Sequence, residues 1–162
     1  MRISSGLTVS VAATDRWFDD IRAGRAFRGY DSITAAAGQL PYVQLFNPVA
    51  SGKIAIARFP EITSAAAQTV EIAFFDTALA LLGPATAKGN LLAGGADPAS
   101  EIRRESNAGI LGDAFASYDV LASVLVRATE EWTIELGAGE GVLVRGRTVA
   151  TGIRVAYSWI EL

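Results

Sequence analysis

The sequence contains no cysteine and no histidine. Without cysteine there is no disulfide framework, no thiolate nucleophile and no cysteine-ligated zinc or iron–sulfur site. Without histidine there is no imidazole metal ligand and no Ser-His-Asp or Cys-His relay. These two absences exclude much of enzyme chemistry before any motif is considered. We therefore expect a protein that is not an enzyme and that holds no cofactor and no metal.

Lysine is scarce as well, because removing Lys53 and Lys88 from the 14 basic residues leaves 12 arginines. Arginine favours planar, bidentate ion pairs. The arginine-rich segment 16–28 is interleaved with aspartates, and the net charge of the chain is -3. A surface that binds nucleic acid usually carries a basic excess. We expect a mixed polar face in this segment and no nucleic-acid partner.

Long apolar runs are also missing, although 51% of the 162 residues are hydrophobic. A membrane-spanning helix needs about 20 consecutive apolar residues, and the best run, residues 78–82, stops at a Gly-Pro pair. Residues 1–13 make a poor signal peptide, because serine and threonine interrupt their apolar stretch. We expect no membrane insertion, so the apolar residues should fill a core or contact other subunits.

Aromatic side chains gather in the segment 15–30, among alternating acids and arginines. Trp17 and Ile21 share one helical face, which predicts a short helix that ends before Gly24. We place residues 1–31 in an N-terminal arm or short helix that lies apart from the main domain and serves for attachment or oligomer contact.

Two interpretations of this arm stay open. In one, it is a helix or loop that packs on the core of its own chain. In the other, it docks on a neighbouring subunit through its aromatic side chains, because aromatic residues and arginine are enriched in the cores of protein interfaces. The candidate interaction residues are Trp17, Phe18, Phe27 and Tyr30.

From residue 32 to 162 the sequence is typical of strands separated by turns. The turn formers between residues 47 and 52 predict a hairpin between the first two strands. The spacing of the strands, without crossover helices, predicts an all-β fold, namely an antiparallel β-sandwich that is jelly-roll-like. The predicted strands cover residues 42–46, 53–59, 69–75, 120–128, 132–136, 141–144 and 151–159.

Two glycine patterns resemble nucleotide-binding motifs but favour turns. Residues 50–53 (ASGK) echo the end of a phosphate loop, yet the first glycine is missing and Ile54 stands where a hydroxyl residue should bind magnesium. Residues 137–141 do not have the dinucleotide-binding spacing and predict a turn with positive φ. Residues 83–100 form a long loop that serves either as a contact or as a plain surface excursion.

Paired carboxylates are the remaining enzymatic option, because glycoside hydrolysis needs neither histidine nor cysteine. Glu101 and Glu105 lie beside arginines 103 and 104, which indicates a salt-bridged surface edge instead of a catalytic pair. The other candidates are Asp19 with Asp20 and Glu130 with Glu131.

Three aromatic residues near the C-terminus, Trp132, Tyr157 and Trp159, have two interpretations. They form either a platform on which a sugar stacks or part of the core. Their placement inside apolar strands favours the core.

Three segments of the sequence carry a resemblance to a known class of proteins. Residues 35–59 (AAAGQLPYVQLFNPVASGKIAIARF) contain a QLFNP-x-x-SGK turn between two strands. Residues 105–112 (ESNAGILG) and 135–162 (ELGAGEGVLVRGRTVATGIRVAYSWIEL) add a second segment and a closing one. Together they resemble virion structural proteins of tailed bacteriophages, of the head-decoration, head-fibre or tail-appendage type.

The resemblance implies a β-sandwich that is a structural component of a phage or phage-like particle, at the capsid surface, neck or tail. It implies a homo-oligomer, a trimer or larger, located in the virion and in contact with other virion proteins such as capsid or tail subunits. It supplies no catalytic residues. The alternative is a module at a fibre or spike tip that binds host glycans or another host receptor.

Overall fold

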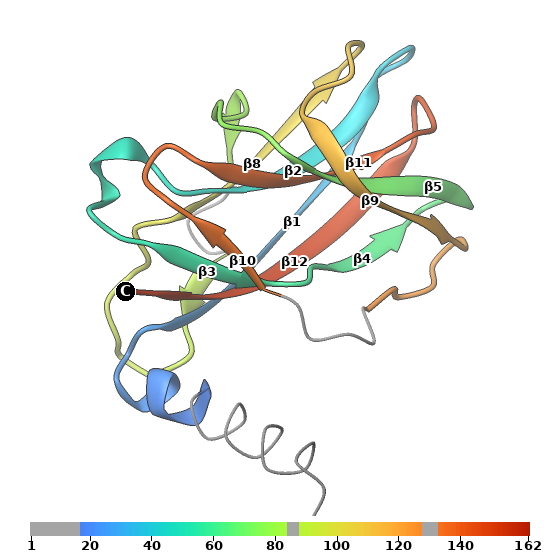
Figure 1. Ribbon diagram of the computed structural model, residues 1–162. Coiled ribbons are helices and arrows are strands. Elements are labelled where there is room, and N and C mark those ends of the chain that lie inside the picture. Colours follow the sequence, from blue (N-terminus) through green and yellow to red (C-terminus); the bar gives the residue numbers. More distant parts are fainter. Residues whose placement is uncertain (1–16, 84–87, 128–132) are drawn as a thin grey trace, which may run out of the picture.

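The computed structural model describes residues 17–83, 88–127 and 133–162. Two antiparallel sheets stack as the layers of a sandwich, and a short helix at residues 17–22 lies outside them (Figure 1). The predicted all-β sandwich with a short helix before Gly24 is confirmed. Within the described residues, no helix combines the length and apolarity needed to cross a membrane.

The strands of each sheet pair antiparallel throughout. Sheet A has the order β10 (Thr133–Leu136), β3 (Ala55–Arg58), β12 (Gly152–Glu161), β1 (Ala26–Thr34) and β7 (Lys88–Asn90), and β4 (Glu61–Ser64) pairs with β12. Sheet B has the order β6 (Leu81–Leu82), β8 (Glu101–Asn107), β2 (Leu40–Phe46), β11 (Gly141–Gly146), β5 (Gln68–Phe74) and β9 (Asp113–Val120).

This strand order is a jelly roll. Counting β3 and β4 as one broken strand, the core order is β1-β12-β3/β4-β10 in one sheet and β2-β11-β5-β9 in the other. The chain therefore crosses between the sheets at the connections β1–β2, β2–β3, β4–β5, β9–β10, β10–β11 and β11–β12. The segment that holds β6, β7 and β8 is inserted between β5 and β9, and it extends both sheets beside β1 and β2.

The predicted hairpin between residues 42–46 and 53–59 is wrong, because β2 and β3 belong to different sheets. Turn-forming residues mark where the chain reverses but not which strand it pairs with next. The connection contains the 3-10 turn η1 (Val49–Ser51), and Gly52 ends that turn with a φ of 62°. This conformation favours glycine, so the SGK sequence is a turn here, as predicted.

The prediction of a strand at residues 120–128 is also wrong. β9 ends at Val120, and residues 121–127 form a connection that touches β4 through the isolated bridges Ile62–Val126 and Ser64–Ala122. Residue 128 lies outside the described residues.

The expected boundary at residue 31 falls inside β1, a strand paired on both sides. Its pairing with β12 runs from Ala26–Ile160 to Thr34–Gly152. β1 therefore belongs to the sandwich, and the described part of the arm comprises residues 17–25. Deleting residues 1–30 would remove half of a core strand.

The core lies between the two sheets and uses the period-two alternation of β12. Val155, Tyr157 and Trp159 are fully buried, as the alternation predicts. The hydroxyl of Tyr157 donates a hydrogen bond of 2.8 Å to the carbonyl oxygen of Val43, so this side chain in sheet A also binds the backbone of sheet B. A buried tyrosine usually finds such a partner.

Asn47 links two of the connections between the sheets. Its side-chain amide donates to the carbonyl oxygens of Lys53 and Leu136 at 2.8 and 3.0 Å. Its backbone N–H donates to the carbonyl of Glu140, and its own carbonyl accepts from the N–H of Gly139, which has a φ of 87°. The β2–β3 and β10–β11 connections are therefore fixed against each other by one residue.

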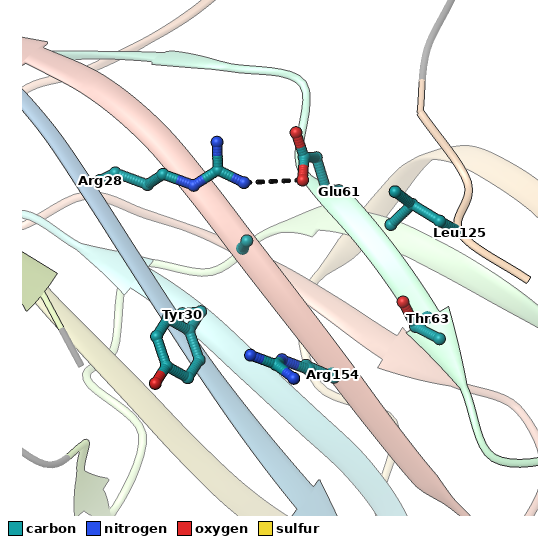
Figure 2. Close-up of a pocket in the computed structure, with 7 residues that line it drawn as sticks. Arg28, Tyr30, Glu61, Thr63, Leu125 and Arg154 are labelled. Carbon is teal, nitrogen blue, oxygen red and sulfur yellow. Dashed lines mark hydrogen bonds and ion pairs between the residues drawn. The ribbon is translucent and has the colours of Figure 1, made fainter. Parts of the chain in front are cut away.

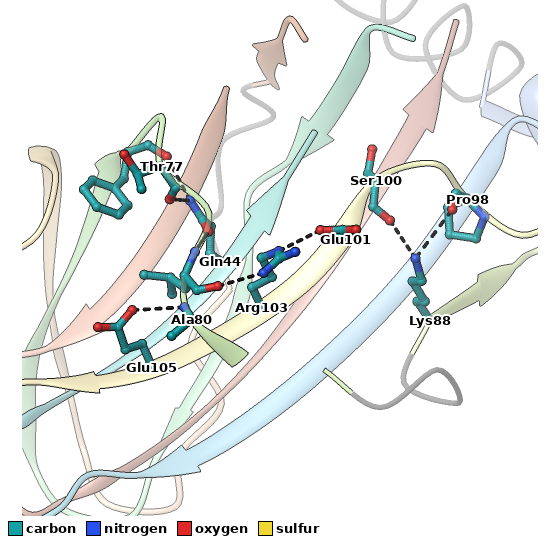
Figure 3. Close-up of polar contacts among 11 residues, drawn as sticks. Gln44, Thr77, Ala80, Lys88, Pro98, Ser100, Glu101, Arg103 and Glu105 are labelled. Atoms are coloured by element: carbon teal, nitrogen blue, oxygen red, sulfur yellow. Dashed lines mark hydrogen bonds and ion pairs between the residues drawn. The ribbon is translucent and has the colours of Figure 1, made fainter. Parts of the chain in front are cut away.

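Gln44 holds a segment of chain against the outer face of sheet B (Figure 3). Its amide nitrogen donates to the carbonyl oxygens of Phe75 and Thr77 at 2.8 and 3.0 Å, and its amide oxygen accepts from the N–H of Leu79. Arg103 donates to the carbonyl of Leu79 at 2.8 Å. Leu79 is buried as a result, in a second, smaller apolar cluster on this face.

We predict that Asn47→Ala lowers the free energy of unfolding by about 2–4 kcal/mol, because a buried carbonyl that loses its donor costs about 1–3 kcal/mol. The control is Asn107→Ala, whose half-buried side chain bonds only within its own strand and turn. Urea unfolding followed by tryptophan fluorescence measures both variants. Equal stability of the two variants would contradict the role given to Asn47.

We also predict that stability falls above about pH 10. Burial raises the pKa of the Tyr157 hydroxyl far above its ordinary value of 10.0, and backbone hydrogen bonds offset this only in part. Above pH 10 the unfolded chain loses the Tyr157 proton while the folded chain keeps it, so the unfolded state gains about 1.4 kcal/mol per pH unit from this residue. Urea midpoints between pH 8 and 11 should decline less steeply for Tyr157→Phe than for the native chain; identical slopes would contradict this.

Candidate functional site

Exposed arginine and aromatic side chains share the outer face of sheet A. On β1, Phe27 is buried, whereas its neighbour Arg28 and the next outward residue, Tyr30, are exposed. On β12 the same alternation directs Arg154 outward. Because β1 and β12 are neighbours in the sheet, these side chains lie on one surface.

A hollow of about 340 Å³ lies on this face. Figure 2 shows its lining side chains on β1, β12 and β4, with one contribution from the β9–β10 connection. The lining residues are Arg28, Tyr30, Glu61, Thr63, Leu125, Arg154 and Ala156.

The strand register explains why the surface is hollow here. Ala156 on β12 lies opposite Tyr30 of β1 on one side and opposite Glu61 of β4 on the other. Its methyl group is the smallest side chain of that row, so it forms the floor between two larger walls. In the next row, Arg154 lies between Ser32 and Thr63.

The charged side chains of the hollow differ in whether they have an ion-pair partner. Glu61 forms one ion pair with Arg28, at 2.8 Å, and a second with Arg127, at 3.4 Å. Both of its carboxylate oxygens are therefore engaged. The guanidinium of Arg154 lies over the ring of Tyr30, 4.6 Å from its centroid. Across residues 17–83, 88–127 and 133–162, no carboxylate pairs with Arg154. The hollow therefore presents an arginine that is positioned by an aromatic ring and has free donors.

The four aromatic residues predicted as interaction sites do not form one surface. Phe27 is 4% exposed and stacks on Trp159 with ring centroids 5.9 Å apart, so its prediction as a contact residue is corrected: a core side chain is not available to a partner. The ring of Trp17 lies under Arg58, at 3.9 Å. Phe18 and Tyr30 are 54% and 46% exposed. The segment thus packs on its own core at Phe27 and leaves Phe18 and Tyr30 open to solvent.

The carboxylates considered for catalysis bind neighbouring groups of the fold. Glu101 pairs with Arg103 at 2.6 Å, which agrees with the predicted salt-bridged edge. Arg104 instead reaches the buried Asp31, at 2.7 Å. Asp20 is buried and pairs with Arg25 at 2.6 Å. In the described part of the chain, no group of three or more acidic side chains is arranged to hold a metal ion.

Among the described residues, the alternative of an aromatic platform near the C-terminus is not formed. Tyr157 and Trp159 are fully buried, so the core interpretation is confirmed for these two. Trp132, with Glu130 and Glu131, lies outside the described residues.

Three aliphatic side chains between residues 121 and 125, called here the aliphatic patch, are exposed, and one of them, Leu125, also lines the hollow. Leu121, Val124 and Leu125 are 66%, 46% and 47% exposed. Their backbone is fixed, because the N–H of Ser123 donates to the carbonyl of Ser64 at 2.8 Å and the adjoining Val126 exchanges hydrogen bonds with β4. The sequence predicts a strand over these apolar residues, so it does not distinguish the aliphatic patch.

Comparison with family models, with curated proteins and with solved structures finds no match for this chain.

Proposed function

We propose that this chain is a structural subunit of a phage or phage-like particle. In this role it assembles as a homo-oligomer of three or more copies and contacts other virion proteins, such as capsid or tail subunits. The resemblance of the three segments supports the proposal. The jelly roll supports it by analogy only, because viral capsid and lectin domains share this architecture while a fold by itself fixes no function.

The residues that carry the resemblance have architectural roles in this chain. Gln44 and Asn47 belong to the QLFNP segment and bind backbone groups of distant loops. Gly139 belongs to the closing segment and binds the carbonyl of Asn47. A sequence pattern that fixes loops between two sheets suits a subunit that must be rigid, and it needs no catalytic group.

The observation that carries the oligomeric role is the aliphatic patch of Leu121, Val124 and Leu125. Exposed apolar groups that cluster on a surface mark interaction sites more often than single ones do. Because the backbone of the patch is already held by hydrogen bonds to β4, little conformational entropy is lost when a second copy covers it.

The open sheet edges are poorer contacts between copies. β9 is the longest edge strand in the described residues, and Asp113 and Asp119 stand at its two ends. Antiparallel pairing of two β9 strands would bring Asp113 of one copy toward the end of the other copy's strand that carries Asp119. Like charges directly opposite each other destabilise a strand pair, so this edge is protected against self-pairing.

We predict that light scattering at micromolar concentration gives the mass of a trimer or a larger assembly. Val124→Asp should reduce that mass, because it places a charge in the apolar contact. Val149→Asp is the control, since Val149 is equally exposed, at 50%, but lies in the β11–β12 turn. A monomeric native chain would overturn the oligomeric role, and equal masses for Val124→Asp and the native chain would exclude this patch as the contact.

The virion role has its own test. We expect antibodies against this chain to label intact phage-like particles at regularly repeated positions in electron micrographs. The particles should come from the organism that encodes the chain. Purified particles that lack the chain would contradict the proposal, even if the isolated protein forms an oligomer.

A second candidate function is a glycan-binding or host-receptor-binding module at a fibre or spike tip. The observation that favours it is the hollow on sheet A, where an exposed aromatic ring, a guanidinium and a hydroxyl group converge on a small apolar floor. Small-molecule sites combine an apolar lining with a few placed polar groups in this way.

A further inference from the structure

We infer that the hollow on the outer face of sheet A binds an acidic sugar, with Arg154 receiving the carboxylate and Tyr30 lying against the sugar ring. This inference rests on the second candidate function and names the class of glycan. It requires a site that prefers an anion, offers an apolar face and has room for a small organic molecule.

The preference for an anion comes from Arg154. Its guanidinium has five N–H donors in a planar fork that matches a carboxylate with two parallel hydrogen bonds. Stacking over Tyr30 holds the fork in place without using its donors. Glu61, the carboxylate that lines the hollow, is already engaged by Arg28 and Arg127, so it does not compete for Arg154.

The preference for a sugar over an inorganic anion comes from the rest of the lining. Tyr30, Ala156 and Leu125 supply apolar surface that a phosphate or sulfate ion would not cover. The hydroxyl of Thr63, which lines the hollow, lies opposite Arg154 in its strand row, whereas Ser32 flanks Arg154 on the other side, outside the lining. Thr63 can exchange a hydrogen bond with a ring hydroxyl next to the carboxylate. A volume of about 340 Å³ falls at the low end of the range for small-molecule sites.

The experiment uses the native chain and a panel of uronate and sialate oligosaccharides. Each acidic probe is paired with the same oligosaccharide after its carboxyl groups are reduced to alcohols. We expect calorimetric titration to show binding of at least one acidic probe, with at least tenfold weaker binding of its reduced partner. Arg154→Gln and Tyr30→Ala should each weaken the acidic probe at least tenfold.

Two controls separate binding from folding. Arg147→Gln removes another exposed arginine, at the β11–β12 turn, and should leave the affinity unchanged. Tyr30→Phe keeps the ring and should retain most of the affinity. The unfolding midpoint and the light-scattering mass of each variant should match those of the native chain.

Each contrary outcome has a distinct meaning. Binding of the neutral partners with equal strength, or binding unaffected by Arg154→Gln, would overturn the inference and leave glycan binding standing. Competition by inorganic phosphate at the same affinity as the sugar would show an anion site without a sugar face, which also overturns it. Absence of binding to every glycan would overturn both the inference and the second candidate function.

Discussion

The fold depends on polar side chains that bind the backbone where the chain crosses between the two sheets. A jelly roll makes this crossing at nearly every connection, and each crossing leaves backbone groups outside the strand ladders that must still be hydrogen-bonded. Asn47 satisfies groups of two such connections at once. Gln44 holds residues 75–79, which stay on sheet B, in a similar way. Glu161 acts similarly, since its carboxylate accepts from the N–H groups of Ala99 and Ser100 and from the indole of Trp159. Asn47, which looks like an ordinary turn former in the sequence, is therefore one of the residues that hold these connections in place.

The polarity of the inward-facing residues explains which strands could be predicted from the sequence. β12 was predicted well because its inward residues are apolar and its outward ones are polar or small. β1 was missed because two of its inward positions, Gly29 and Asp31, are not apolar, so the alternation is hidden. β8 was missed for a related reason: Arg104 pairs with Asp31 of the opposite sheet. An ion pair between inward-facing residues of two strands interrupts the apolar alternation by which each strand would be recognised.

The candidate site was less predictable than the fold. The alternation of β12 was enough to direct Arg154 outward, but Tyr30 was assigned to an arm along with Phe27. Recognising β1 would have separated the two, since residues three apart on a strand face opposite sides. The hollow also needs the long-range register that places Ala156 between Tyr30 and Glu61. Pairing between strands more than 90 residues apart in sequence is not encoded in any local pattern.

The two proposed surfaces meet at Leu125, which lines the hollow and belongs to the aliphatic patch. A second copy seated on the patch would therefore stand at the rim of the hollow. A ligand that contacts both copies would bind more tightly when the copies are associated. Because such coupling is reciprocal, the ligand would strengthen their association by the same factor. A shallow site with one free arginine gives weak affinity on its own. Three or more copies in one particle would raise the overall avidity by about 10²–10⁴-fold where a multivalent glycan spans them. A structural role and weak recognition of acidic glycans are thus compatible, because assembly supplies the strength that the single site lacks.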